Sequence, residues 1–374
     1  MPARLLALPL ALASLLVAAG CSFGEPEPDR AGEPPSFPSP SPSPTASGPA
    51  ADPSQLVATV LAKGLRVPWG VAFLPDGGAL VTERDSGKIL KVGPNSEPEG
   101  MTVETVQTVA ESDARGEGGL MGIAVSPDYD TDKTVFIYYT TAEDNRIARL
   151  VLGQRPRPIV TGIPVSGIHN GGRLAFGPDG FLYATTGDAS RRGLAQDRRN
   201  LGGKILRMTP AGKPAPGNPF NSLVWSYGHR NVQGIAWDPD KRLYATEFGQ
   251  NTWDELNLID KGRNYGWPLV EGRGDLEEYR NPFVQWRTED ASPSGLAYLD
   301  GSLWAGALRG GRLWQIPVTA SGTGRPRDFF VGDFGRMRTV VAAPDGNLWV
   351  TTSNRDGRGD PAPQDDRILV VAPR

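Results

Sequence analysis

The residues best suited to chemistry begin with a histidine, one of only two in a chain of 374 residues. His169 lies in the stretch GIHNGGRLAFGPDG, directly ahead of a Gly-Gly pair and an apolar run. Imidazole is largely neutral near pH 7 and can accept a proton, so His169 is a candidate general base. The other interpretation is a polar residue at a strand end. His229 is interpreted as structural, because it and its neighbour Arg230 point to opposite sides of an extended segment.

Four arginines are candidates for binding an anionic group, because a guanidinium can bond a carboxylate through two nitrogens. They are Arg230, Arg309, Arg336 and Arg338. Any one of them alone would more often be a solvated side chain that pairs with a neighbouring acid. Their significance therefore depends on whether the fold brings them together.

A second group of candidates lies in EFGQNTWDELNLIDKGRNYGWP, residues 247–268. Gly249 and Gln250 would offer backbone carbonyls, Asp254 and Glu255 offer carboxylates, and Tyr265 follows in a glycine-rich turn. Calcium takes about six to eight oxygen ligands, so the residue types allow a calcium site. The spacing is not that of an EF-hand. The competing interpretation is a carboxylate pair on an exposed loop.

These candidates must be positioned by the surrounding elements, and the chain repeats one pattern six times. Each copy is a short apolar strand, a tight turn that contains aspartate, and a second apolar strand. In the Pro-Asp-Gly turns, proline presets the turn and glycine relieves it. The copies span residues 69–83, 121–139, 172–186, 233–247, 294–306 and 338–352. Successive turn aspartates are 45 to 61 residues apart, which fits a blade of four strands with loop insertions.

The repeat therefore predicts an all-β fold, a six-bladed β-propeller of four-stranded antiparallel blades. A pair of β-sandwiches would not explain a repeat of this length. An apolar stretch at 55–65 precedes the first copy, and another at 366–372 closes the chain. We expect these two stretches to complete one blade together and so to close the ring.

The repeat also predicts which residues gather. In a propeller, the segment before each inner strand and the loop after the second strand lie on one face, around the central channel. The residues placed on this annulus are Glu117, His169, Arg230, Asn231, Arg309, Arg336 and Arg338, with Asp85, Asp188, Gly249 and Asn354 on the returning loops. A histidine surrounded by arginines predicts a site for an anionic ligand beside a base.

The first residues of the chain predict export. Arg4 gives a positive start, residues 5–19 are nearly all apolar, and small residues lead to Cys21, the only cysteine. Residues 17–21 resemble a bacterial lipobox, which implies a signal peptide over 1–21, cleavage before Cys21 and lipid on its sulfur. The alternative is an ordinary secretory signal with a spare thiol. A single cysteine excludes an internal disulfide and a cysteine metal cluster.

Residues 22–55 are rich in proline and serine and predict an extended, disordered tether ahead of a propeller domain over 56–374. This organisation would place the domain outside the cytoplasm, held at the membrane only through Cys21, or secreted if the lipobox is not used. The net charge of −3 gives no sign of a nucleic-acid partner.

With these residues in place, the chain resembles the quinoprotein glucose/sorbosone dehydrogenase family, especially its bacterial aldose sugar dehydrogenase branch. The resemblance covers roughly residues 57–373. Its motifs are GEGGLMGIAVSPDY, HNGGRLAFGPDGFLYATTGD, GHRNVQGIAWDP, DELNLIDKGRNYGWP and GRMRTVVAAPDGNLWV, in family order. It implies a six-bladed propeller that binds pyrroloquinoline quinone (PQQ), a flat quinone with three carboxylates, and Ca²⁺. The implied reaction oxidises aldose sugars at C1 to lactones by hydride transfer to the quinone.

The resemblance also implies roles for single residues. His169 would take the proton from the sugar C1 hydroxyl. Arg230 and Asn231 would contact the quinone oxygens, with Arg230 stabilising the charge of the reduced ring. Arg336 and Arg338 match a pair that binds or covers the PQQ carboxylates.

Further matches concern the metal, the substrate and the remaining cofactor contact. Gly249 and Gln250 would offer carbonyls to calcium, with Asp254, Glu255 and Tyr265 forming or supporting the metal sites. The chain departs from the soluble glucose enzymes of the family at residues 248–250, where Phe-Gly-Gln replaces a Gln-Gly-Pro calcium loop, and at three single positions. Glu117 stands where those enzymes have a glutamine that contacts the substrate, and Arg309 stands where they have a lysine that contacts the cofactor. Ile168 stands where they have an acidic residue just before the base. The orientation of His169 must therefore come from elsewhere.

Two other functions compete with the dehydrogenase. One is a non-enzymatic, surface-anchored propeller that binds carbohydrate or protein and would have no need of a buried base. The other is a Ca²⁺-dependent lactonase-like propeller, whose central metal would need several acidic and amide ligands where this annulus has arginines. The sequence names neither the sugar nor the electron acceptor.

Overall fold

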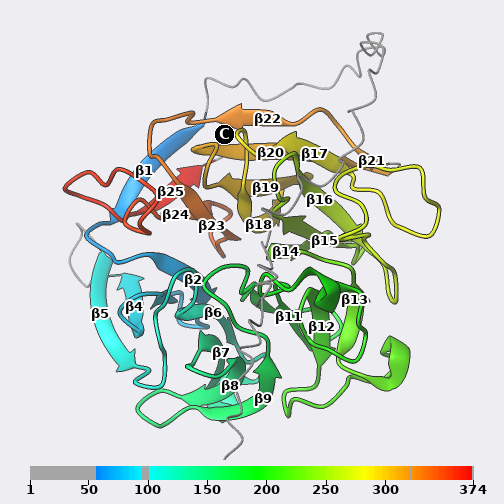
Figure 1. Ribbon diagram of the computed structural model, residues 1–374. Coiled ribbons are helices and arrows are strands. Elements are labelled where there is room, and N and C mark those ends of the chain that lie inside the picture. Colours follow the sequence, from blue (N-terminus) through cyan, green and yellow to red (C-terminus); the bar gives the residue numbers. More distant parts are fainter. Residues whose placement is uncertain (1–55, 95–100, 321, 373–374) are drawn as a thin grey trace, which may run out of the picture. The chain divides into compact units, whose positions relative to one another are not determined.

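Six antiparallel sheets surround a central channel and form a β-propeller, as the repeat predicted (Figure 1). The computed structural model describes residues 56–94, 101–320 and 322–372. The predicted signal peptide over 1–21, with Cys21, and the predicted tether over 22–55 lie outside the described residues. No helix in the described part has the length and apolar character that a membrane span requires.

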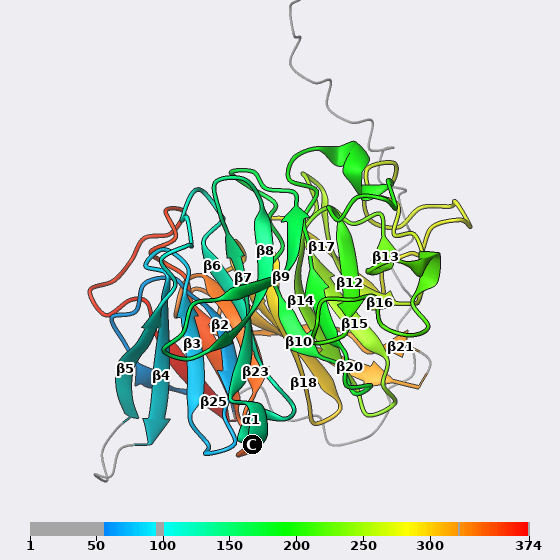
Figure 2. The same cartoon turned by 90° about the horizontal axis from the view of Figure 1, so that it is seen from below.

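Each of the first three blades uses four strands that are consecutive in the sequence (Figure 2). Blade 1 contains β2 (Pro68–Phe73), β3 (Ala79–Glu83), β4 (Lys88–Pro94) and β5 (Met101–Thr108). Blade 2 contains β6 (Leu120–Val125), β7 (Thr134–Thr140), β8 (Asn145–Val151) and β9 (Arg157–Ile163). Blade 3 contains β10 (Leu174–Phe176), β11 (Leu182–Thr185), β12 (Lys204–Met208) and β13 (Val224–Tyr227).

The last three blades follow the same plan with two variations. Blade 4 contains β14 (Val232–Trp237), β15 (Leu243–Glu247), β16 (Trp253–Ile259) and β17 (Val284–Arg287). Blade 5 contains β18 (Pro293–Leu299), β19 (Ser302–Ala307) and β20 (Arg312–Thr319), with the short strands β21 (Gly322–Thr323) and β22 (Arg327–Phe329) both pairing with β20. Blade 6 contains β23 (Met337–Ala342), β24 (Leu348–Thr352), β25 (Ile368–Ala372) and β1 (Val57–Ala62). The short helices are α1 (Tyr129–Asp132), η2 (Arg192–Ala195) and η3 (Pro219–Asn221).

Blade 6 joins the beginning of the described chain to its end. Strand β1 pairs antiparallel with β25, from Val57 opposite Ala372 to Ala62 opposite Ile368. The expectation that the stretches 55–65 and 366–372 share a blade is confirmed. This pairing places both ends of the described chain in one blade and so closes the ring, with β1 as the outer strand of that blade.

The predicted tight turns form as the sequence suggests. In blade 1, the Gly77 N–H donates a hydrogen bond to the Leu74 carbonyl at 3.0 Å, across the Pro-Asp pair. Gly77 has a φ of +84°, a conformation that side chains with a Cβ rarely adopt. The turns of blades 3 and 6 repeat this bond, from Gly180 to Gly177 and from Gly346 to Ala343.

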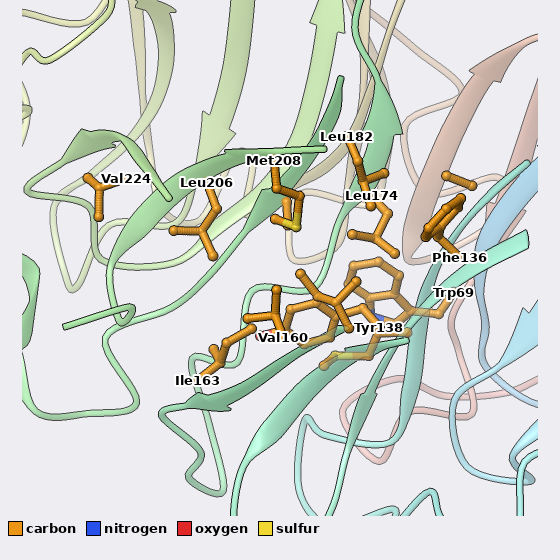
Figure 3. Close-up of a cluster of buried hydrophobic side chains, with 14 residues drawn as sticks. Trp69, Phe136, Tyr138, Val160, Ile163, Leu174, Leu182, Leu206, Met208 and Val224 are labelled. Carbon is orange, nitrogen blue, oxygen red and sulfur yellow. The ribbon is translucent and has the colours of Figure 1, made fainter. Parts of the chain in front are cut away.

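The core lies between neighbouring blades, where their apolar faces meet. Figure 3 shows one such cluster, in which Phe136 and Tyr138 of blade 2 face Leu182 and Leu206 of blade 3 beside Trp69. All five side chains are almost fully buried. Burial of apolar surface between blades fixes their spacing and so positions the loops that carry the candidate site.

Candidate active site

The residues predicted to surround the channel meet at one cavity of about 610 Å³. Its walls come from the segments before the inner strands and from the returning loops of several blades. The predicted residues that line it are Glu117, His169, Arg230, Gly249, Gln250, Asp254, Arg309, Arg336 and Arg338. Asn231, Glu255 and Tyr265 do not line it. The convergence of His169 with four arginines is therefore present in the structure.

His169 is oriented by Asp188. The imidazole Nδ1 lies 2.8 Å from the Asp188 Oδ1, and the Asp188 side chain is fully buried. The second oxygen, Oδ2, accepts a hydrogen bond from the Trp267 indole N–H at 2.8 Å. An ionised carboxylate accepts hydrogen bonds and cannot donate one, so we assign the imidazole proton to Nδ1. The other ring nitrogen, Nε2, then carries the free lone pair. Asp188 supplies the orienting group that Ile168 cannot.

Burial alone would raise the pKa of Asp188. The hydrogen bonds and charge of His169, together with the bonds from Trp267 and the Ser190 N–H, nevertheless hold that pKa below its ordinary value. Asp188 is thus ionised at neutral pH. An ionised partner favours proton acceptance at the opposite nitrogen, because it stabilises the imidazolium that results.

The backbone of His169 is also held in place by neighbouring residues. His169 has a φ of +60°, and its N–H donates to the Glu117 Oε2 at 3.0 Å. The other Glu117 oxygen forms an ion pair with Arg358 at 2.8 Å. A Cβ on Gly187 would lie 1.9 Å from the His169 carbonyl oxygen, so this packing requires glycine there. Glu117, which the resemblance matches to a substrate contact, thus holds the backbone of the candidate base.

Arg336 and Arg338 share one carboxylate. Arg336 contacts the Asp356 Oδ2 with its Nε at 3.0 Å and its Nη2 at 2.9 Å, and Arg338 contacts it with Nη2 at 3.1 Å. Burial lowers the pKa of Arg338 to about 10, although the charge of Asp356 opposes this. Two guanidinium groups beside one carboxylate leave a net positive charge at the cavity wall.

Arg230 and Arg309 have no carboxylate within ion-pair distance among the described residues. Arg230 donates from Nη1 to the Phe248 carbonyl at 3.2 Å, and its buried Nε has no partner. Arg309 makes only a long contact of 3.5 Å to the Thr288 hydroxyl. Burial lowers the pKa of Arg230. These two cations are free to pair with an anion in the cavity.

The predicted metal ligands fall into two places. Asp254 lies at the cavity, where its carboxylate accepts the Gly249 N–H at 2.9 Å and the Ser292 N–H at 2.5 Å. Glu255 and Tyr265 instead line a small neighbouring hollow, which shares Gly249 with the cavity. The Tyr265 hydroxyl bonds with backbone groups, donating to Leu258 and accepting from Asp260.

Both places hold a buried carboxylate whose charged form a calcium ion would stabilise, because burial also raises the pKa of Glu255 in the hollow to about 8. Burial raises the pKa of Asp254 to about 7, so a cation beside its carboxylate would stabilise the charged form. Within the described residues, no group of three or more His, Cys, Asp or Glu side chains is arranged to hold a metal. A metal here would therefore depend on backbone carbonyls such as those of Gly249 and Gln250.

Asn231 and His229 lie behind the cavity wall. The Asn231 Oδ1 accepts the Gly171 N–H at 3.0 Å, and its buried Nδ2 has no partner. His229 is fully buried between the Ser226 hydroxyl and the Glu247 carboxylate, both at 2.8 Å. The structural interpretation of His229 agrees with this geometry.

Sequence reasoning missed three charged residues that line the cavity, and it missed the role of a fourth residue, Asp188. Arg84, which pairs with Asp85, lines it, as do Asp356 and Arg358. Asp188 was placed on a returning loop but not recognised as the partner of His169. The signal for that pair was available, since both residues flank the same hairpin of β10 and β11. Asp356 and Arg358 lie on a loop beyond the repeat, which carries no comparable signal.

Comparisons with known proteins show the family to which the chain is similar. Residues 65–363 match the family model described as Glucose / Sorbosone dehydrogenase. The aldose sugar dehydrogenase YliI of Escherichia coli (strain K12) is 29% identical, over 87% of this chain and 95% of the relative. Quinoprotein glucose dehydrogenase B of Acinetobacter calcoaceticus is 34% identical over 59% of this chain and 54% of the relative. The PQQ-bound aldose sugar dehydrogenase of Streptomyces coelicolor is 50% identical, with a TM-score of 0.82 over 87% of this chain and 99% of that structure.

Proposed function

Because this chain belongs to the glucose/sorbosone dehydrogenase family, we propose that it is a PQQ-dependent oxidoreductase that oxidises aldose sugars at C1. The observation that carries the proposal is the pairing of His169 with Asp188 in a cavity that also holds Arg230 and Arg309. A base with a fixed tautomer suits proton removal from a hydroxyl. Unpaired guanidinium groups suit an anionic cofactor.

The residues present fit PQQ. Its three carboxylates need cationic partners. Arg230 and Arg309 can serve, because neither forms an ion pair with a carboxylate among the residues that the structure describes. The buried Arg230 Nε, which lacks a hydrogen-bond partner, would gain one from a bound oxygen acceptor. A cavity of about 610 Å³ is also within the usual range for a cofactor or small ligand. Arg336 and Arg338 would add charge-assisted bonds to a carboxylate.

In the reaction, the bound quinone supplies a two-electron acceptor for the hydride that leaves sugar C1. His169 performs the matching proton transfer: its Nε2 takes the proton of the C1 hydroxyl, so that the C1–O bond becomes the carbonyl of a lactone. Asp188 stabilises the imidazolium through Nδ1, and the hydrogen bond from the Trp267 indole holds the Asp188 carboxylate in position. Arg230 stabilises the negative charge that develops in the cavity.

Calcium is part of the proposal. Asp254 and the carbonyls of Gly249 and Gln250 would hold the ion, which would add positive charge beside the cofactor. Removing calcium with a chelator should then weaken PQQ binding, and adding Ca²⁺ should restore it. Magnesium provides the control, because its stricter geometry should restore binding less well.

Steady-state assays test the proposal. Purified protein given PQQ and Ca²⁺ should reduce an artificial dye when aldoses are added. His169→Ala should bind PQQ but lose activity by about 10²- to 10⁴-fold, the usual contribution of a general base. Absence of PQQ binding in a titration would contradict the proposal. Sugar binding without turnover, unaffected by His169→Ala, would favour the non-enzymatic propeller.

We further propose that the protein acts outside the cytoplasm, anchored by lipid at Cys21. The support is the composition of residues 1–21 and the tether-like residues 22–55. Expressed in a bacterium with labelled fatty acid, the full chain should carry label and fractionate with membranes. Cys21→Ser should lose both properties. Label on the Cys21→Ser variant, or soluble wild-type protein without label, would contradict the anchor.

A further inference from the structure

A further arginine, which does not line the cavity itself, lies beneath it inside the central channel. Arg173 precedes β10 and lines a second cavity of about 270 Å³, whose walls come from the inner strands of all six blades. Its Nε donates to the Gln233 carbonyl at 2.9 Å and its Nη1 to the Trp69 carbonyl at 3.2 Å. Gln233 and Trp69 both line the upper cavity. Arg173 therefore separates the candidate site from the channel below it.

The side chain of Arg173 also links blades across the channel. Its acceptors belong to blade 4 (Gln233), blade 1 (Trp69) and blade 6, where Nη2 donates to the Thr339 hydroxyl at 3.2 Å. The guanidinium lies 4.3 Å from the centre of the Trp69 ring. One residue of blade 3 thus contacts three other blades. A purely structural role is the first explanation to test.

The charge of Arg173 points to a second role. All its hydrogen-bond acceptors are neutral, and no carboxylate in the described part of the chain forms an ion pair with it. Burial, together with the charge of Arg338, lowers the pKa of Arg173 to about 9, so the group is still charged at neutral pH. Burying a cation without a counter-ion is costly. An anion bound in the cavity above would remove part of that cost.

We propose that Arg173 is a positioning residue that supplies positive potential to the floor of the cavity. It strengthens binding of the trianionic cofactor and favours its reduced form, which carries more negative charge. The inference rests on the proposed function, since PQQ is the anion that it concerns. Arg173 touches neither the sugar nor the reacting atoms in this account.

Substitutions at Arg173 separate charge from the structural link. Arg173→Lys keeps the charge but loses the fork of donors. Arg173→Met and Arg173→Gln lose the charge, and glutamine keeps a donor, so it provides a second neutral variant if the methionine variant does not fold. Thr339→Val removes one acceptor of Arg173, together with the hydrogen bond that the Thr339 hydroxyl donates to the Trp69 carbonyl, and leaves the charge. All four changes disturb the link between blades and should lower the melting temperature.

Two measurements then decide: the PQQ dissociation constant, from quenching of tryptophan fluorescence, and the midpoint potential of the bound cofactor. In the neutral variants, the dissociation constant should rise about tenfold or more and the midpoint potential should fall. Arg173→Lys and Thr339→Val should stay within about twofold of wild type. Neutral variants that match Arg173→Lys in both measurements would overturn this inference alone. Wild-type protein that fails to bind PQQ would overturn the proposed function and this inference with it.

Discussion

In the proposed reaction, Asp188 orients the imidazole of His169, the candidate base. Without a partner, either imidazole nitrogen could carry the proton, and the ring could rotate. The carboxylate at 2.8 Å from Nδ1 fixes both, and the Trp267 indole fixes the carboxylate. At the scale of the residue, the proposed proton transfer therefore depends on three linked side chains, those of His169, Asp188 and Trp267.

Asp188→Asn should reduce kcat by about 10²- to 10⁴-fold, because the neutral amide neither enforces the Nδ1–H tautomer nor stabilises the imidazolium. PQQ binding should be almost unchanged, since the arginines are untouched. Dye-linked kinetics and a PQQ titration measure the two quantities. A variant with wild-type kcat would show that Asp188 does not orient the base.

The same residue predicts a pH dependence of stability. The pKa of Asp188 is lowered in the folded protein, so its stabilising contribution is fully present above the ordinary carboxyl pKa. That contribution disappears as the pH falls through the lower, folded value. The free energy of unfolding should therefore fall more steeply below about pH 4 in wild type than in Asp188→Asn. Denaturant titrations at several pH values above and below this point measure the free energy of unfolding of both proteins. The same pH dependence in wild type and in Asp188→Asn would contradict the prediction.

At the scale of the element, the stability of the propeller depends on the pairing of β1 with β25 in blade 6. Strand β1 lies at the outer edge of the blade with three of its six residues exposed, whereas β25 lies inside with Ile368, Leu369 and Val371 fully buried. The loop between β24 and β25 carries Asp356 and Arg358 to the cavity. Loss of this pairing would therefore disturb the site as well as the fold.

Two residues that face each other across β1 and β25 provide a matched test. Val60 lies opposite Leu369 in the register, but Val60 is 41% exposed and Leu369 is fully buried. Leu369→Ala should lower the free energy of unfolding by about 2–5 kcal/mol. Val60→Ala should change it by less than about 1 kcal/mol. Equal effects in chemical denaturation would contradict the described closure.

At the scale of the whole molecule, the repeat made most of the fold predictable. Six similar hairpins at a blade-sized period identify a propeller, and equivalence between blades then predicts that His169 and Arg230 share a face. The partners of individual side chains were harder to predict from the sequence, because these contacts join residues of different blades. Trp267 reaches Asp188 across 79 positions, and Arg358 reaches Glu117 from the last loop. Such contacts depend on loop geometry, which the repeat does not encode.

The charge around the cavity predicts that ionic strength affects binding. Six arginines line it against three acidic residues, Glu117, Asp254 and Asp356. The affinity for PQQ should therefore fall several-fold as NaCl rises from about 0.05 M to about 0.5 M, because salt screens the attraction. Arg309→Met should show a weaker dependence on salt. An affinity that does not change with salt would contradict this electrostatic account.

The central claim is that His169 takes a proton from an aldose while the bound cofactor takes the hydride. Stopped-flow absorbance tests this directly, with PQQ-loaded protein mixed with aldoses and no dye present. Wild-type protein should show reduction of the cofactor at a rate that rises with sugar concentration. His169→Ala, loaded to the same extent, should remain oxidised over the same period. Reduction at the wild-type rate in His169→Ala, or none in wild type with any aldose, would contradict the account.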